Sequence, residues 1–206
     1  MDVCVNPSLV TLLVGLLYIL IFGGLSLLRR EGLSNQFAFE GLAITSAAVL
    51  FSLLTSVSLN PILFLVIIYL ITMRSRLLVD VGNFLASRGR REAALSVYRW
   101  ALKLWPDCAS QAVVLINRGV VELQQGRLRA AIASLEKALG AKKLGHLGLK
   151  YEAACRYNLG LAYGRSGRES EASRELNEVV DLFPTSIYAL QARRALKERP
   201  WRRKRP

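Results

Sequence analysis

The chain has 206 residues, of which 52% are hydrophobic, and its formal net charge at pH 7 is +13. Its mean hydropathy of +0.31 is high for a soluble repeat protein. Residues 1–73 contain few charged side chains, namely Asp2, Arg29, Arg30, Glu31 and Glu40, and most lysines and arginines follow residue 73. This shift argues against a wholly soluble chain and predicts an apolar N-terminal part, residues 1–74, joined to a basic C-terminal part.

Three apolar stretches in the N-terminal part are candidate membrane spans. The first, residues 9–28, is uncharged and long enough to cross ~30 Å of hydrocarbon. The chain begins with Asp2 and no nearby basic residue, so we expect a retained anchor and not a cleaved signal peptide. The second and third stretches, residues 41–58 and 61–74, are separated by a proline that ends a helix.

The lengths of the stretches do not decide between three membrane crossings and two. With two crossings, either the second or the third stretch lies in the interface or re-enters the membrane. Basic residues that flank spans prefer the cytoplasmic side. The arginine pair at 29–30 follows the first stretch, and Arg74 and Arg76 follow the third. Three crossings place both pairs on one side, so we favour an integral membrane protein with its N-terminus outside and its C-terminal part cytoplasmic.

A pattern of small residues occurs three times in the C-terminal part. Each copy has a glycine, a second glycine seven residues later and an alanine five residues after that. The copies are Gly82, Gly89 and Ala94; Gly119, Gly126 and Ala131; and Gly160, Gly167 and Ala172. Small residues allow two antiparallel helices to pack closely, and the second glycine of each copy suits the turn between them. An in-frame repeat of this kind predicts stacked helix pairs.

The hydrophobic spacing after residue 74 predicts helices and no strands. The expected pairs are 75–88 with 90–104, 110–124 with 127–140, and 149–165 with 168–183, followed by a last helix over 186–198. The last helix would cover the exposed end of the stack. No glycine or proline separates the third apolar stretch from the first helix, so we expect one long helix from residue 61 to about 88. The longer interval at 140–148 is either a tolerated insertion or a partner-contacting loop.

These residues resemble the tetratricopeptide-repeat (TPR) family, whose motif of about 34 residues has glycine, alanine, aromatic and proline positions in this order. The third copy carries Leu159, Gly160, Tyr163, Gly167, Ala172, Leu176, Val179 and Pro184. The second copy has Arg118 and Glu122 where Leu and Tyr are usual. Together with the apolar stretches, which predict transmembrane helices, the resemblance implies an all-α fold in which these helices are followed by a TPR α-solenoid. Its expected parts are repeats 75–108, 112–145 and 153–186, and a capping helix with a basic tail over 187–206.

In this family the first helix of each pair lines a concave face that binds another protein. The resemblance therefore implies a partner-binding groove of Val79, Asn83, Val113, Ile116, Asn117, Val120, Leu123, Tyr157, Leu161 and Arg165. An apolar groove suits an amphipathic helix or an extended segment of a protein partner. Alternatively, these side chains pack against neighbouring helices, or the tail of the chain fills the groove.

One TPR subtype grips a C-terminal carboxylate with two asparagines and several basic residues. Asn83 and Asn117 match the asparagine positions. Val79, Tyr157 and Leu161 stand where basic residues are needed. Neutral amides bind a carboxylate weakly compared with charged donors, which disfavours this kind of binding.

The C-terminal tail is the strongest charge feature of the chain. Its basic residues are Arg193, Arg194, Lys197, Arg199, Arg202, Arg203, Lys204 and Arg205. Close to a bilayer they could contact anionic lipid, and in solution they could bind nucleic acid nonspecifically or remain solvated.

The sequence predicts no cofactor, metal or catalytic site. The single histidine, His146, has no nearby cysteine or carboxylate. Cys4, Cys108 and Cys155 are far apart, and no phosphate-binding loop or hydrolase motif is present. We therefore expect a non-enzymatic, membrane-anchored TPR scaffold or adaptor at the cytoplasmic membrane face, acting in the assembly of a membrane complex. The alternatives are a structural subunit whose repeats only pack and, less favoured, a nucleic-acid-binding protein.

Overall fold

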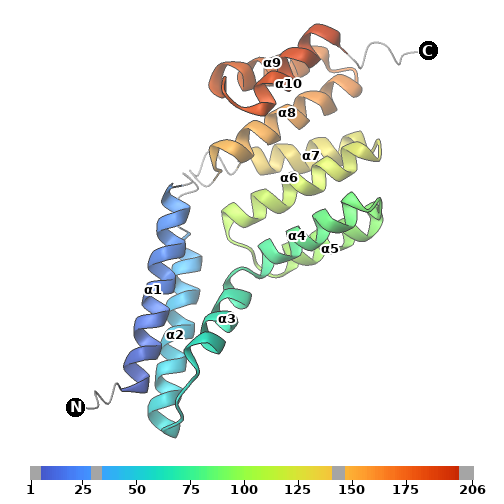
Figure 1. The fold of residues 1–206 in the computed structure, drawn as a ribbon. Coiled ribbons are helices and arrows are strands. Elements are labelled where there is room, and N and C mark those ends of the chain that lie inside the picture. The colour runs from blue at the N-terminus through green and yellow to red at the C-terminus, as the bar shows by residue number, and fades with distance from the viewer. Residues whose placement is uncertain (1–5, 29–33, 141–146, 200–206) are drawn as a thin grey trace.

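The computed structural model describes residues 6–28, 34–140 and 147–199, and every element within these ranges is an α-helix. The helices form two parts (Figure 1). Helices α1, α2 and α3 form a limb at the N-terminal side, and α4 to α10 stack beside its end. The predicted all-α fold is confirmed.

Helices α1 (Pro7–Leu28) and α2 (Asn35–Thr55) lie side by side, and both are long and apolar enough to cross a membrane. Helix α3 (Pro61–Thr72) has 12 residues and is only about 18 Å long at 1.5 Å per residue. It returns toward the end of the limb at which α1 stops (Figure 1). The predicted break before Pro61 is confirmed, because the Asn60 side chain caps α3 by accepting from the backbone N–H groups of Ile62 and Leu63.

The limb is held together by small and polar residues that allow close helix contact. A Cβ added at Gly15 would lie 2.3 Å from Thr45 Oγ1, so only glycine fits there. The hydroxyl groups of Tyr18 and Thr72 lie 2.6 Å apart and join α1 to α3. Such contacts are the usual means by which helices associate in lipid. The buried apolar side chains between the three helices are Tyr18, Phe37, Phe64 and Ile68.

Helix α2 begins at Asn35, well before the predicted start of the second apolar stretch at residue 41. The side chain of Ser34 caps it by accepting from the backbone N–H of Phe37. Glu40 therefore lies inside α2, within the candidate span 35–55. A carboxyl group within a candidate span needs a partner.

The expectation of one long helix from residue 61 to about 88 is wrong. Helix α4 (Arg74–Ser87) is bent away from α3 by 73°. No proline or glycine lies at the bend, but the Arg74 side chain donates to the carbonyl oxygen of Ile71 over 2.8 Å. A side chain that bonds to a helical carbonyl is one of the known causes of a kink. The third apolar stretch thus reaches α4 through a sharp turn.

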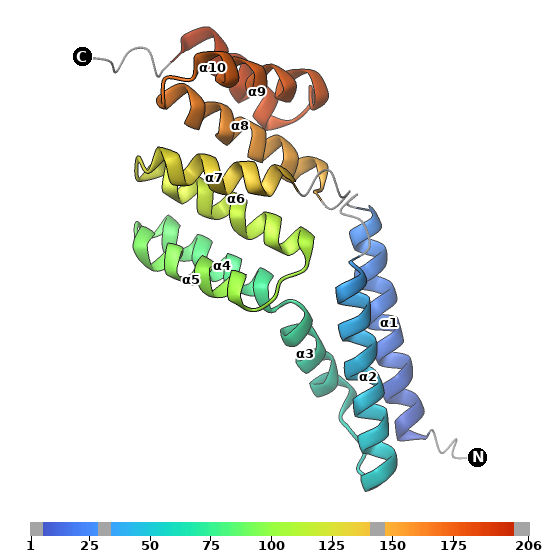
Figure 2. The same cartoon turned by 180° about the vertical axis from the view of Figure 1, so that it is seen from behind.

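The stack consists of three antiparallel helix pairs and a final helix. The pairs are α4 with α5 (Arg91–Lys103), α6 (Cys108–Gln124) with α7 (Leu128–Gly140), and α8 (Leu149–Arg165) with α9 (Glu169–Leu182). Helix α10 (Ile187–Glu198) packs on α8 and α9 and covers that end of the stack, as predicted. Figures 1 and 2 both show α4 and α5 beside the end of α3, with α10 at the opposite end of the stack.

The turn glycines have the role that the repeat predicted. Gly89, Gly126 and Gly167 have φ angles of +78°, +75° and +87°, which residues with a side chain rarely adopt. In the first copy the N–H of Arg90 donates to the carbonyl oxygen of Leu85 over 2.9 Å, and the other two copies repeat this bond. This is the Schellman arrangement, which ends one helix and directs the chain into the next.

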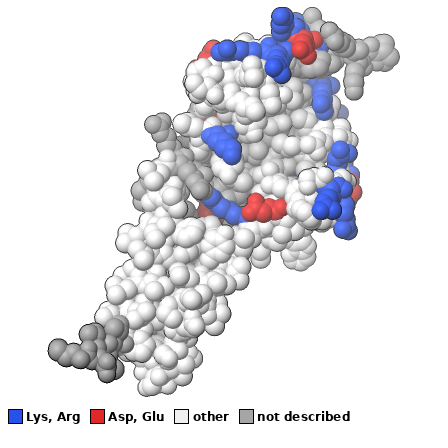
Figure 3. Space-filling view, in the orientation of Figure 1, with Lys and Arg blue, Asp and Glu red and all other residues white. Residues whose placement is uncertain are grey.

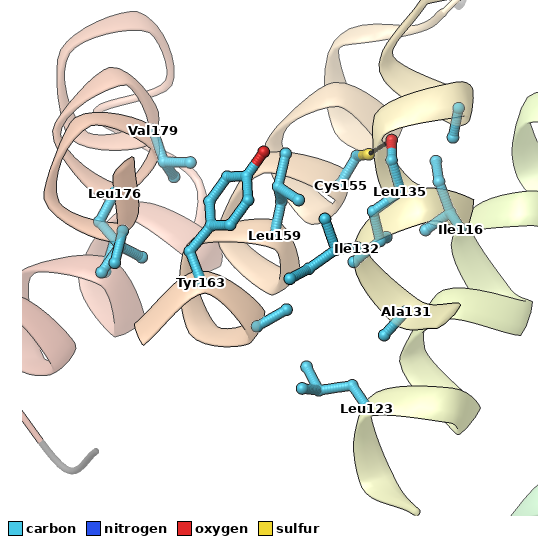
Figure 4. Packing of buried hydrophobic residues seen from close by; sticks show 14 of the residues in the cluster. Ile116, Leu123, Ala131, Ile132, Leu135, Cys155, Leu159, Tyr163, Leu176 and Val179 are labelled. Carbon is cyan, nitrogen blue, oxygen red and sulfur yellow. Dashed lines mark hydrogen bonds between the residues drawn. The ribbon is translucent and has the colours of Figure 1, made fainter. Parts of the chain in front are cut away.

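The first glycine of each copy lies at a close contact within its pair. An added Cβ would lie 2.3 Å from a ring carbon of Tyr98 at Gly82 and 2.7 Å from Leu135 at Gly119. The copy at Gly160 meets Leu176 in the same way, at 2.8 Å. Leu135 and Leu176 are among the buried side chains of the second and third pairs that Figure 4 shows.

Candidate partner groove and membrane junction

Four of the predicted groove residues are buried and do not line an open surface. They are Val79, Val113, Ile116 and Leu123, each at most 7% exposed. Figure 4 shows Ile116 and Leu123 among the packed side chains. The sequence assigned these four to the groove because they lie on the first helix of each pair. They instead contact neighbouring helices, since α6 packs against α4 and α8 as well as α7.

The other six predicted groove residues reach the surface. Asn83 and Arg165 are exposed, and Asn117, Val120, Tyr157 and Leu161 are half-buried. The Asn83 side-chain oxygen accepts from the hydroxyl of Tyr98 over 2.7 Å. The Asn117 amide donates to the carbonyl oxygen of Val113 over 2.8 Å. Both asparagines therefore bond within the chain, which leaves less of each amide for a ligand.

The accessible part of the groove lies on α6 and α8 and is mainly apolar. The ring of Tyr157 lies 5.8 Å from the ring of Tyr188 on α10. Burial raises the pKa of Tyr157, and the positive charge of Arg165 opposes this shift. Arg165 also donates to the carbonyl oxygen of Leu123. An apolar strip with one cation at its end suits a helix or an extended segment of a partner.

The unusual residues of the second repeat form an ion pair in which the carboxylate is buried and the arginine is half-buried. Glu122 is 3% exposed and accepts from Arg118 over 2.8 Å and from the hydroxyl of Ser134 over 2.8 Å. The carboxylate thus replaces the usual aromatic ring at this position and joins α6 to α7. A buried charge needs such partners, so these two motif departures are coupled.

A second buried ionic cluster lies in the third repeat, and sequence reasoning missed it. Arg156 on α8 contacts the carboxylates of Glu152, Glu175 and Glu178. Burial alone would lower the pKa of Arg156, but the hydrogen bond that Arg156 donates to Glu152 and the three negative charges raise it. The spacing of Glu152 and Arg156 along one helix is the only local signal of this cluster.

The limb and the stack meet at a polar junction around Arg74. Its guanidinium pairs with Glu40 of α2 over 2.6 and 2.9 Å. It also donates to the carbonyl oxygens of Leu104 and Trp105, in the connection between α5 and α6. Gln36 of α2 donates to the same carbonyl oxygen of Trp105 over 2.7 Å. The sequence carried a signal for this junction, because Glu40 is a lone acid next to an apolar stretch.

A cavity of 280 Å³ lies next to this junction. Its walls come from α1, α2, α3, α4 and the start of α6, and they include Phe22, Tyr69, Arg76, Asp80 and Asp107. Within the described residues, no group of three or more His, Cys, Asp or Glu side chains is arranged to hold a metal ion.

The basic tail is described only in part. Arg193, Arg194, Lys197 and Arg199 are exposed on α10 or directly after it, at the end of the stack opposite α4 (Figures 1 and 2). The other four, Arg202, Arg203, Lys204 and Arg205, lie outside the described residues, as do His146, Cys4 and most of the loop at 140–148.

Comparisons with known proteins support the repeat assignment. Two family models described as Tetratricopeptide repeat match residues 73–143 and 116–187. Together they cover residues 73–187, which is more than half of the chain. A comparison with curated proteins finds no match.

Proposed function

The chain belongs to the tetratricopeptide-repeat family, and on that premise we propose that it is a membrane-anchored scaffold that holds a protein partner at the cytoplasmic membrane face. TPR repeats are protein-interaction units, and none of the described side chains forms a recognisable catalytic arrangement. The observation that carries the proposal is the direct attachment of the stack, through Arg74 and Glu40, to α2, which packs on α1 and like it could span a membrane.

The arrangement of the limb favours three passes with the N-terminus outside. Helix α2 runs antiparallel to α1, and α3 returns beside them toward the stack (Figure 1). Residues 56–60 are not helical, so this segment and α3 together would complete the third pass. The arginine pair at 29–30 and Arg74 then fall at the same membrane face, as the positive-inside rule requires.

The mechanism that follows is one of local concentration. A groove fixed to the membrane meets membrane-bound clients in two dimensions, which raises its effective concentration for them. The apolar strip around Val120, Tyr157 and Leu161 would bind a helix or an extended segment of the client. By this route the protein would assist the assembly of a membrane complex.

Photo-crosslinking tests the groove. A crosslinking residue at Leu161 or Arg165 should trap a membrane-associated protein, whereas one at Lys137, exposed on the outer helix α7, should not. Ile116 and Leu123 are unsuitable because they are buried. Trapping only residues 187–206 of the same chain would show that the tail fills the groove and would remove the basis for a client site.

A charged groove variant separates the scaffold from a structural subunit. Leu161→Glu in the full chain should abolish copurification of the crosslinked partner while the thermal unfolding midpoint stays close to that of the parent. If the variant folds and the same proteins still copurify, the spans make the essential contacts and the structural-subunit alternative is favoured.

A further inference from the structure

The first repeat exposes large apolar side chains at the end of the stack beside the limb. Trp105 is 84% exposed, Trp100 is 62% exposed and Leu104 is 40% exposed. Trp100 and Leu104 are four residues apart and thus lie on one face, and Trp105 follows directly. We call Trp100, Leu104 and Trp105 the tryptophan patch.

The backbone of Trp105 holds its side chain outward. Its φ angle is +47°, a left-handed conformation that is unfavourable for a bulky residue. Its carbonyl oxygen accepts from Gln36 of α2 over 2.7 Å and from Arg74 of α4 over 3.0 Å. One donor from the limb and one from the stack therefore hold the Trp105 carbonyl in this conformation, and strain that neighbouring residues maintain often marks a functional position.

The same contacts set the depth of the tryptophan patch. Gln36 lies in the first turn of α2, at the end of a candidate span. Because the carbonyl oxygen of Trp105 accepts from Gln36, Trp105 lies at the same depth as the start of α2. If α2 crosses a bilayer, this level is the interface with water, where tryptophan side chains are enriched.

Cations accompany the exposed rings of the first repeat. The Lys103 ammonium lies 5.0 Å from the centre of the Trp100 ring, and the Arg88 guanidinium lies 4.9 Å from the centre of the Phe84 ring. Figure 3 shows a white surface over the limb and blue side chains at the edge of the stack. An aromatic ring beside a cation matches the boundary between acyl chains and anionic headgroups.

The ends of a solenoid need a cover because each pair leaves an apolar face bare. Helix α10 covers the far end, but among the described residues no helix plays this role beyond α4 and α5. We propose that the bilayer crossed by the limb is the missing cover: the tryptophan patch inserts into its cytoplasmic interface, with Lys103 at the headgroups. This proposal rests on the membrane anchoring proposed above.

Depth-dependent fluorescence quenching in lipid nanodiscs tests the proposal with the full chain. Trp105 is made the sole tryptophan by Trp100→Phe and Trp201→Phe. In a second variant, Trp105→Phe and Trp201→Phe leave Trp100 as the sole tryptophan. Nanodiscs contain phosphatidylglycerol and phosphatidylcholine with a nitroxide either near the headgroup or at the end of the acyl chain. Both tryptophans should lose more fluorescence to the shallow nitroxide than to the deep one.

The matched control is Leu190→Trp in a chain whose three native tryptophans are replaced by phenylalanine. Leu190 is 53% exposed on α10 at the far end of the stack, so neither nitroxide should quench it. Equal quenching of Trp105 and of the Leu190→Trp control would overturn the proposal. Flotation with vesicles after carbonate treatment is measured in parallel. A chain that floats but shows no quenching of Trp105 refutes the tryptophan patch alone, whereas a chain that does not float refutes the anchoring.

Discussion

Glu40 and Arg74 form a two-point ion pair between α2 and α4 although they are 34 residues apart in sequence, with atom pairs at 2.6 and 2.9 Å. The same guanidinium donates to the carbonyl oxygen of Ile71, at the bend, and to those of Leu104 and Trp105. One side chain thus bonds to the helix end at the bend and joins the limb to the first repeat.

The first prediction concerns this ion pair. Arg74→Lys keeps the positive charge but loses the two-point geometry and most of the carbonyl contacts. Hydrogen bonds to charged groups contribute about 1.5–3 kcal/mol each to stability. Because the two side chains are about a quarter exposed, we expect the free energy of unfolding to fall by an amount near the lower value. The measurement is the thermal unfolding midpoint in detergent, together with the distance between spin labels on α2 and α7.

A matched control is Arg127→Ala, which removes an exposed pair with Glu92 on the stack. It should leave both the midpoint and the spin-label distance unchanged. An unchanged distance in Arg74→Lys as well would show that Arg74 does not set the angle between the limb and the stack.

The second prediction concerns the glycine at the close contact of the second repeat. Gly119→Ala places a Cβ 2.7 Å from Leu135 and 3.3 Å from the carbonyl oxygen of Ala131. Overpacking of this kind costs about 1–3 kcal/mol. Gly140→Ala is the control, because nothing lies within 4 Å of its added Cβ. Chemical unfolding, followed by circular dichroism, should show a lower free energy of unfolding for Gly119→Ala and no decrease for Gly140→Ala.

The third prediction concerns the buried cluster around Arg156. Arg156→Met removes the cation that Glu152 and Glu175 share, although these carboxylates are only 3% and 4% exposed, and leaves Arg174 as the remaining cation beside Glu175. Breaking a buried pair on one side costs about 3–5 kcal/mol. Adding Glu152→Gln and Glu175→Gln should restore part of the lost stability, because no charge then remains buried. If the triple variant is less stable than Arg156→Met alone, the carboxylates do not depend on Arg156, and contacts such as that of Glu175 with Arg174 stabilise them.

The fourth prediction concerns the thiol of Cys155, which is buried and donates to the carbonyl oxygen of Leu135 over 3.2 Å (Figure 4). Burial raises the pKa of Cys155 from 9.0 to about 12. Because the folded pKa lies above the unfolded one, this contribution to stability is complete below about pH 9. It should be lost as the pH rises toward 12, and Cys155→Ala should flatten the dependence of the unfolding midpoint on pH over this range.

Because Cys155 is buried, the exposed Cys108 is the thiol that can report the topology. Cys108 is exposed and Cys155 is not. In a Cys4→Ser chain, an impermeant maleimide at pH 8 should label Cys108 alone, and only from the cytoplasmic side of inverted membranes. Labelling from the outer face would contradict the proposed orientation, and labelling of Cys155 in the folded chain would contradict its burial.

Local spacing was enough to predict the helix pairs, the turns at the second glycines and the break at Asn60-Pro61. These features depend on residues a few positions apart. The turn glycines need a positive φ, and the proline cannot continue a helix, whatever the rest of the chain does. The repeat also predicted the close contacts, because a missing side chain is visible in the sequence.

The sequence alone thus determined the class of protein, an apolar limb followed by a TPR stack, since hydrophobic periodicity and repeated glycines are local properties. Only the tertiary structure decided the bend at Met73, the pairing of Glu40 with Arg74 and the burial of Ile116 and Leu123. These features depend on which helix faces meet, and side chains on separate helices meet at positions that no local pattern records. Packing geometry therefore determined which of the predicted groove residues reach the surface.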